Sequence, residues 1–144
     1  MYLDTSIIIK LLVREPDSAF FDENLAGQAL SSSELAWAEV LSALLSKERN
    51  RQITAKDRAQ AWLSFSGWIE SGQIKLHPLN GAVLKKASHL LARCHPAVPL
   101  RALDAIHTAA CDLSQDFPLC TNDRRMRDAA SVLGIPVFPE DKPS

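Results

Sequence analysis

The amino-acid sequence predicts a single α/β domain whose helices cover both faces of a short, mainly parallel sheet. Two observations lead to this fold class. Short apolar stretches with strand character alternate with longer stretches of helical periodicity, and this alternation is typical of a parallel sheet between two helical layers. The length of 144 residues suits one hydrophobic core. We therefore expect one three-layer domain over residues 1–139, followed by a frayed tail over residues 140–144.

The first half of the chain begins with a short strand that ends at Asp4. Thr5 or Ser6 can cap the helix that follows it and runs through residues 12–13. A turn at residues 15–18 starts a second helix, and residues 28–30 form a weak strand. A long helix then starts at residues 31–33 and runs to about residue 47, and Ser31 and Glu34 have the spacing of a capping box at its start.

The second half continues the alternation. Helices start at Thr54 and at Asn80, because both residue types are favoured helix caps. The expected elements are a helix over 54–69, a strand over 73–76, helices over 80–93 and 102–113, a strand over 119–121, a helix over 124–133 and a strand over 136–138. In such a sheet, ligands bind beyond the carboxyl ends of the strands. The residues that follow each strand are therefore the first candidates for a site.

The composition is that of a globular protein, with 47% apolar and 23% charged residues. No apolar stretch reaches the roughly 18 residues that span a bilayer, and no small-residue cleavage site follows the early isoleucine run. We therefore expect a cytoplasmic protein without a membrane partner. The three cysteines are odd in number and widely spaced, which argues against a disulfide framework. The net charge of −1 neither indicates nor excludes a nucleic-acid partner.

Two acidic residues follow predicted strands. Asp4 lies between apolar residues, where an unpaired carboxylate costs several kcal/mol. Asp123 stands in "PLCTNDRR" before a predicted helix. Each residue alone can be explained as a helix N-cap. Both nevertheless fall at the end of the sheet where ligands bind in parallel α/β proteins, so both are candidate site residues.

Two further acids lie on predicted helices. Glu39 points away from the apolar stripe of its helix at about 100° per residue, either into a cleft or into solvent. Asp104 stands in "ALDAIHTAAC", on a helix with little polar surface. A helix dipole contributes only about 0.3–1 kcal/mol to such a carboxylate at an exposed site. A cation shared by several carboxylates would be sufficient to hold it.

Four acids without a cluster of His or Cys favour Mg²⁺ or Mn²⁺ over zinc. His107 and Cys111 stand four residues apart, but no second pair completes a tetrahedral zinc site. We expect His107 to form hydrogen bonds near Asp104 and Cys111 to be buried. A divalent cation at such a site can activate water and stabilise an in-line phosphoryl transition state.

Four segments of the chain resemble the signature segments of PIN-domain ribonucleases, in particular VapC-type toxins of bacterial toxin–antitoxin pairs. They are "YLDTSIIIKLL", "SELAWAEVLSAL", "LRALDAIHTAA" and "LCTNDRRMRDAASVLGIPVF", which together extend from residue 2 to residue 138. The resemblance implies a PIN-like α/β/α fold and places the metal-binding acids at Asp4, Glu39, Asp104 and Asp123. His107 and Asn122 depart from residue types that many members carry, but neither stands at a ligand position.

The resemblance also implies metal-dependent cleavage of RNA, inhibition by a small cognate antitoxin, and a homodimer. The resemblance further implies that Thr5 and Thr121 hold the acids in place without binding the metal themselves. Arg101, Arg124 and Arg125 are candidate RNA contacts, although a solvated helix face also explains the last two. Two other functions stay open: a non-catalytic module that binds RNA or protein, and a phosphohydrolase with Asp4 as the nucleophile. The second is disfavoured because no aspartate follows two residues after Asp4.

Overall fold

A computed structural model describes residues 1–141 of the chain, and the last three residues of the expected tail lie outside this range. Its sheet has the strand order β3-β2-β1-β4-β5, with parallel pairings throughout. The strands are β1 (Tyr2–Leu3), β2 (Leu30–Ser33), β3 (Ile74–His77), β4 (Leu119–Cys120) and β5 (Val137–Phe138). The helices are α1 (Thr5–Leu12), α2 (Ser18–Leu25), α3 (Ala36–Arg49), α4 (Ala55–Glu70), α5 (Gly81–Cys94), α6 (Ala102–Ser114) and α7 (Arg124–Leu133).

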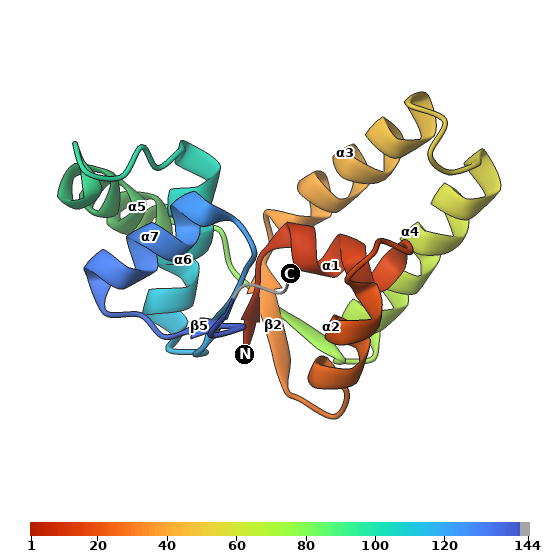
Figure 1. Cartoon of the computed structure of the whole chain (residues 1–144), viewed down its shortest axis with the longest axis horizontal. Helices are drawn as coiled ribbons and strands as arrows, with labels where there is room; N and C mark the ends of the chain where they lie inside the picture. The colour runs from red at the N-terminus through yellow and green to blue at the C-terminus, as the bar shows by residue number, and fades with distance from the viewer. Residues whose placement is uncertain (142–144) are drawn as a thin grey trace.

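The helices form two layers on opposite faces of the sheet. Helices α1 to α4 lie on one side, and α5, α6 and α7 lie on the other (Figure 1). The alternation of side chains along β1 connects the two cores, because Leu3 packs with α1, α3 and α4 while Tyr2 packs with α5, α6 and α7. The predicted three-layer α/β/α fold is therefore confirmed.

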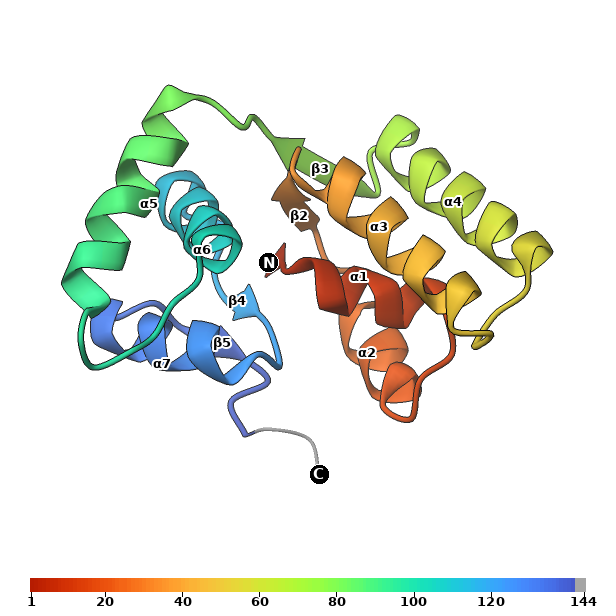
Figure 2. The same cartoon turned by 90° about the horizontal axis from the view of Figure 1, so that it is seen from above.

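Strand β1 is central, and its carboxyl end positions the acids. It pairs with β4 so that Leu3 lies opposite Cys120, and the N–H of Asp4 donates to the carbonyl oxygen of Cys120 at 3.1 Å. Asp4 and Thr121 therefore leave the sheet side by side. Figure 2 shows β1 followed directly by α1, with β2 on one side and β4 on the other.

The prediction for residues 31–34 was wrong. Ser31, Ser32 and Ser33 belong to β2, which pairs in register with β3 from Leu30 opposite Ile74 to Ser33 opposite His77. The Ser32 hydroxyl donates to the carbonyl of Leu3 at 2.8 Å, so a polar side chain is satisfied inside the sheet. Pairing with strands that are distant in sequence overrides the local preference of serine for a helix start.

The predicted capping box at Ser31 and Glu34 does not form. Helix α3 begins at Ala36, and its N-cap Leu35 makes no side-chain capping bond. Glu34 instead accepts a hydrogen bond from the N–H of Leu79 at 3.0 Å. The capping bonds predicted for Thr54 and Asn80 are present, and Thr54 forms a full capping box with Asp57.

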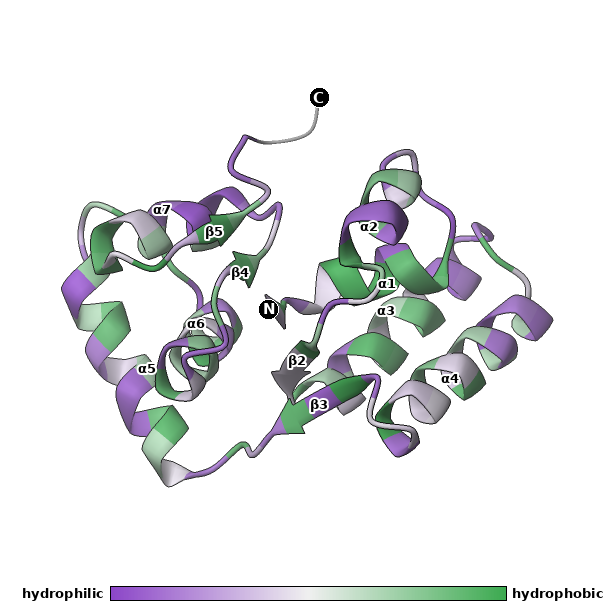
Figure 3. Cartoon of the chain, turned by 90° about the horizontal axis from the view of Figure 1, so that it is seen from below, coloured by the Kyte–Doolittle hydropathy of each residue, from purple (hydrophilic) through white to green (hydrophobic). Residues whose placement is uncertain are grey.

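Helix α1 is capped by Asp4 and not by Thr5 or Ser6, the residues that the sequence favoured. Figure 3 shows hydrophobic segments in α1, whereas α7 begins with hydrophilic residues. The apolar face of α1 packs into the core through Ile7, Ile8 and Ile9. Within residues 1–141, no helix combines the length and the apolar character needed to cross a membrane.

Candidate active site

Asp4 is the most deeply buried of the four predicted acids, with 4% of its surface exposed. Its Oδ1 accepts hydrogen bonds from the Ser6 hydroxyl at 2.6 Å and from the N–H of Ile7 at 3.1 Å. Its Oδ2 accepts a hydrogen bond from the Thr121 hydroxyl. Burial raises the pKa of Asp4, and the hydrogen bonds from Ser6, Thr121 and Ile7 offset this only in part.

Thr121 connects the two acids that follow strands. Besides donating to Asp4, its hydroxyl oxygen accepts a hydrogen bond from the N–H of Asp123 at 3.0 Å. Asp123 is the N-cap of α7, because its Oδ1 accepts from the N–H of Met126 at 3.0 Å. One threonine thus holds a loop with two carboxylates in a defined arrangement.

Glu39 lies in the first turn of α3 and is bound by groups from two other elements. Its Oε1 accepts hydrogen bonds from the Thr5 hydroxyl at 2.8 Å and from Nε2 of His107. Burial acts to raise the pKa of Glu39, but the hydrogen bond and electrostatic interaction with His107 and the hydrogen bond from Thr5 outweigh it, so the pKa is lowered. The charged form of Glu39 is therefore favoured.

Asp104 and Asp123 both lie next to the guanidinium group of Arg101. The Nε atom of Arg101 lies 3.2 Å from Oδ2 of Asp104, and its terminal nitrogen lies 3.9 Å from Oδ2 of Asp123. The Arg101 side chain is 64% exposed. Of the other predicted RNA contacts, Arg124 and Arg125 are exposed on α7, and Arg124 lies 3.9 Å from Asp128.

A half-buried lysine, Lys10, is linked through Asp17 to the loop that carries Asp123. Lys10 donates to Oδ1 of Asp17 at 2.8 Å and lies 3.5 Å from Glu15. The side-chain amide of Asn122 donates to the other oxygen of Asp17 at 3.1 Å. Asn122 therefore connects the β4–α7 loop to the start of α2.

The family follows from sequence comparison. The sequence pattern of the PIN domain matches residues 1–132. This chain belongs to the PIN-domain family. It is 41% identical over 141 residues to ribonuclease VapC46 of Mycobacterium tuberculosis, across 96% of this chain and 95% of that protein. It is 34% identical over 145 residues to ribonuclease VapC45 of the same species, across 96% and 94% of the two chains. The resemblance to VapC-type proteins is thereby confirmed.

Solved structures share the fold of this PIN domain. FitAcB of Neisseria gonorrhoeae superposes with a TM-score of 0.67 at 16% identity, over 95% of each chain. VapBC2 of Rickettsia felis, solved bound to a DNA fragment from its promoter, superposes with a TM-score of 0.65 at 14% identity, over 94% of this chain and 95% of that chain. These likenesses support the α/β/α architecture of this PIN domain.

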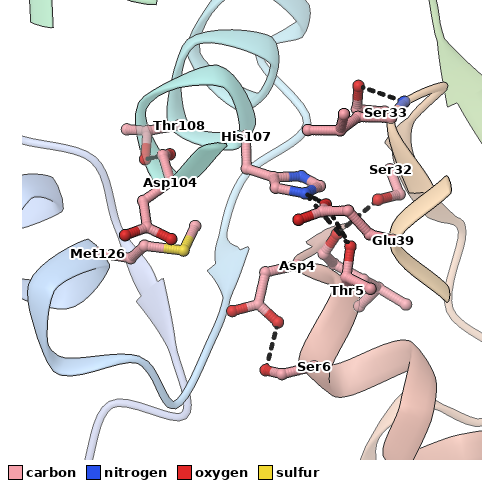
Figure 4. A network of polar contacts seen from close by, with 12 residues as sticks. Asp4, Thr5, Ser6, Ser32, Ser33, Glu39, Asp104, His107, Thr108 and Met126 are labelled. Carbon is pink, nitrogen blue, oxygen red and sulfur yellow. Dashed lines mark hydrogen bonds and ion pairs between the residues drawn. The ribbon is translucent and has the colours of Figure 1, made fainter. Parts of the chain in front are cut away.

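The donor set of the PIN domain suits a hard divalent cation, because the four acids offer only carboxylate oxygens. Figure 4 shows Asp4, Glu39 and Asp104 around the space between α1, α3 and α6. In residues 1–141 no group of three or more acidic, His or Cys side chains lies close enough to hold a metal ion. Arg101 contacts two of the acids, Asp104 and Asp123, and His107 contacts a third, Glu39. The chemistry of the residues fits a metal, but Arg101 would have to release its carboxylates.

His107 and Tyr2 were missed as site residues. His107 was expected near Asp104, but its ring reaches Glu39 and Tyr2 instead. Both of its nitrogens are engaged inside the protein, so it has no free nitrogen for zinc. Side-chain alternation contained a signal, because Tyr2 lies in β1 two residues before Asp4, and an extended chain directs residues two apart to the same face. The partner of His107 on α3 depends on tertiary packing.

Proposed function

We propose that this PIN domain is a metal-dependent endoribonuclease and the toxin of a toxin–antitoxin pair. The observation that carries the proposal is the buried carboxylate of Asp4, joined through Thr121 to Asp123 at the carboxyl ends of β1 and β4. A carboxylate kept in a low-dielectric site is costly unless a cation binds it. The identity to proteins named ribonucleases supports RNA as the substrate.

The residues that would hold Mg²⁺ or Mn²⁺ are Asp4, Glu39, Asp104 and Asp123. When bound, the cation would activate a water molecule and offset charge on the attacked phosphate. The contribution of the chain is to fix the carboxylates. Thr121 orients Asp4 and the Asp123 loop together, and Thr5 holds Glu39.

Arginine side chains at the rim supply attraction for RNA. Arg101 is mostly exposed beside Asp104, so once released from the carboxylates its guanidinium can bind a backbone phosphate. Arg124 and Arg125 extend the same basic surface along α7. Recruitment of RNA against four carboxylates therefore depends on these cations and weakens as salt rises.

A small antitoxin protein is the proposed partner, and a homodimer the proposed assembly. A groove of about 610 Å³ lies between α1 and α3 beside Glu39. Apolar residues such as Ile9, Ala43 and Leu103 line it. Its position next to the acids allows one partner to fill the groove and to cover Glu39 at the same time.

The test measures cleavage of total cellular RNA with Mg²⁺ or Mn²⁺ and with EDTA. We expect cleavage with either metal, none in EDTA, and none for Asp4→Asn or Asp123→Asn. Asp22→Asn is the matched control, since Asp22 is 44% exposed on α2, pairs with Arg14 and should leave the rate unchanged. Full cleavage in EDTA would overturn the metal requirement. RNA binding without cleavage by the wild type would identify a non-catalytic module instead.

A further inference from the structure

The two carboxylate oxygens of Glu39 have different environments. Both hydrogen bonds described for this carboxylate, from Thr5 and from His107, end on Oε1. Oε2 accepts no hydrogen bond from the described residues. A carboxylate held through one oxygen keeps the other available to a cation or a water molecule. The question is which residues fix this orientation.

His107 supplies one of these constraints from a second helix. It is 3% exposed on α6, and its Nε2 contacts Oε1 of Glu39 on α3. An ionised carboxylate only accepts hydrogen bonds, so Nε2 must carry a proton. The bond is charge-assisted on the carboxylate side, which makes it stronger than a neutral one. His107 therefore holds Glu39 across the boundary between two helices.

Tyr2 fixes the His107 ring from behind. Its hydroxyl oxygen lies 2.8 Å from Nδ1 of His107, and the two rings are 5.9 Å apart at 70°. Tyr2 is fully buried in β1. A neutral imidazole accepts from the hydroxyl, and a charged imidazole donates to it, but Nε2 is protonated in both cases. The orientation of the ring toward Glu39 thus does not depend on its charge.

Apolar packing alone does not explain why Tyr2 and His107 are buried together. A buried hydroxyl and two ring nitrogens require partners, and each unpaired group costs about 1–3 kcal/mol. Here all three are paired in one series from β1 through α6 to α3. A phenylalanine and a leucine would fill similar space without these requirements. The hydrogen bonds instead run from Tyr2 through His107 and end on Oε1 of Glu39, a carboxylate of the candidate site.

We propose that His107, oriented by the Tyr2 hydroxyl, is a positioning residue that holds Oε1 of Glu39 and leaves Oε2 to the divalent cation. This inference rests on the proposed function for the role of Glu39. Partners of metal-binding carboxylates that do not touch the metal commonly change metal affinity or activity by about 10–100-fold when removed. Neither Tyr2 nor His107 needs to touch substrate for this effect.

The experiment measures Mn²⁺ affinity by calorimetry without RNA, and separately kcat and KM for RNA. We expect His107→Leu to weaken Mn²⁺ binding about tenfold or more and to lower kcat with little change in KM. Tyr2→Phe, which removes a single oxygen, should act in the same direction even if His107→Leu fails to fold. His107→Gln keeps a side-chain N–H and should retain more affinity than His107→Leu.

Two controls separate positioning from general packing. His77 stacks on Tyr2 with ring centroids 6.4 Å apart but pairs with Asp116, away from Glu39. We expect His77→Gln to leave Mn²⁺ affinity and kcat unchanged. In a Glu39→Ala background, His107→Leu should have no further effect on either quantity, because its partner is gone.

The outcomes are distinct. Equal losses from His107→Leu with and without Glu39 would overturn the positioning role, as would unchanged Mn²⁺ affinity and kcat in both His107→Leu and Tyr2→Phe. If the wild type binds Mn²⁺ but cleaves no RNA, the proposed function fails, and the Mn²⁺ measurements still decide whether His107 positions Glu39.

Discussion

Replacement of Asp4 by Asn separates the charge of this residue from its hydrogen bonds. Asn is as good an N-cap as Asp, so the bond from the N–H of Ile7 can persist at Oδ1. The bond from Ser6 ends on the same oxygen. The new amide would face Thr121, whose oxygen already accepts from Asp123 and has a second lone pair. The bonds from Ile7 and Ser6 can therefore be kept while the buried charge is removed. The Thr121 hydroxyl exchanges its bond to the carboxylate for a bond from the amide, and the sulfur of Met126, 3.9 Å away, can accept its proton.

The effect of this change on stability has a definite sign. Burial raises the pKa of Asp4 in the folded state, so the ionised carboxylate destabilises the fold. This penalty is absent below the ordinary Asp value of 3.8, grows as the pH rises through the raised pKa, and is constant above it. Asp4→Asn should thus be as stable as the wild type or more stable at neutral pH, and the advantage should shrink as the pH falls toward 3.8.

Asp4→Ala provides the contrast. It removes the N-cap, at about 1 kcal/mol, and unlike Asn it leaves the buried Thr121 hydroxyl with no hydrogen bond to residue 4, at about 1–3 kcal/mol. Ser6 is exposed and can bond to water. The alanine variant should therefore lose roughly 2–4 kcal/mol in the free energy of unfolding. Urea unfolding in EDTA at neutral and acidic pH measures all three proteins. Equal losses for Asn and Ala would refute the reasoning and identify the charge itself as a structural anchor.

Two further predictions concern cations beside the acids. Arg101→Gln should raise Mn²⁺ affinity by at most about fivefold, since an exposed pair contributes about 0–1 kcal/mol, and should raise KM for RNA; weaker Mn²⁺ binding by calorimetry would contradict it. Lys10→Met should lower the free energy of unfolding by about 1–3 kcal/mol, because Asp17 and Glu15 lose their cation. Burial acts to lower the pKa of Lys10, but Asp17 and Glu15 outweigh it and raise the pKa above 10.5. Urea unfolding at neutral pH should therefore record the full loss of stability. An unchanged free energy of unfolding at neutral pH would contradict the prediction.

The parts of the fold that the sequence predicted correctly are those with a local physical signal. Helices α4 and α5 were placed from Thr54 and Asn80, whose side chains cap them as expected. The acids after β1 and β4 were placed by the rule for parallel sheets. Strand β2 was predicted over residues 28–30 but lies at Leu30–Ser33, because its serines have no strand signal of their own. Its pairing with β3 and the bond from Ser32 to Leu3 depend on residues distant in sequence.

The candidate site divides in the same way. The sequence identified the acids by residue type and position, and the structure joins Asp4 to Asp123 through Thr121 as a bridge. The role of His107 was not predictable, because its contact with Glu39 joins two helices separated by 68 positions. The contact of Arg101 with Asp104 and Asp123 was not predictable either. It depends on the rotamer of an exposed side chain, which sequence spacing does not determine.

Asp4 and Asp123 belong to the candidate site and also stabilise the fold as helix N-caps. Asp4 and Asp123 each accept a backbone N–H at the start of a helix, α1 and α7, through one carboxylate oxygen. A helix N-terminus carries a partial positive charge, which stabilises a carboxylate placed there. The capping bonds therefore fix the side chains and offset part of the cost of concentrating negative charge. Glu39 lacks such a position as an N-cap, which explains why its orientation depends on Thr5 and His107 instead.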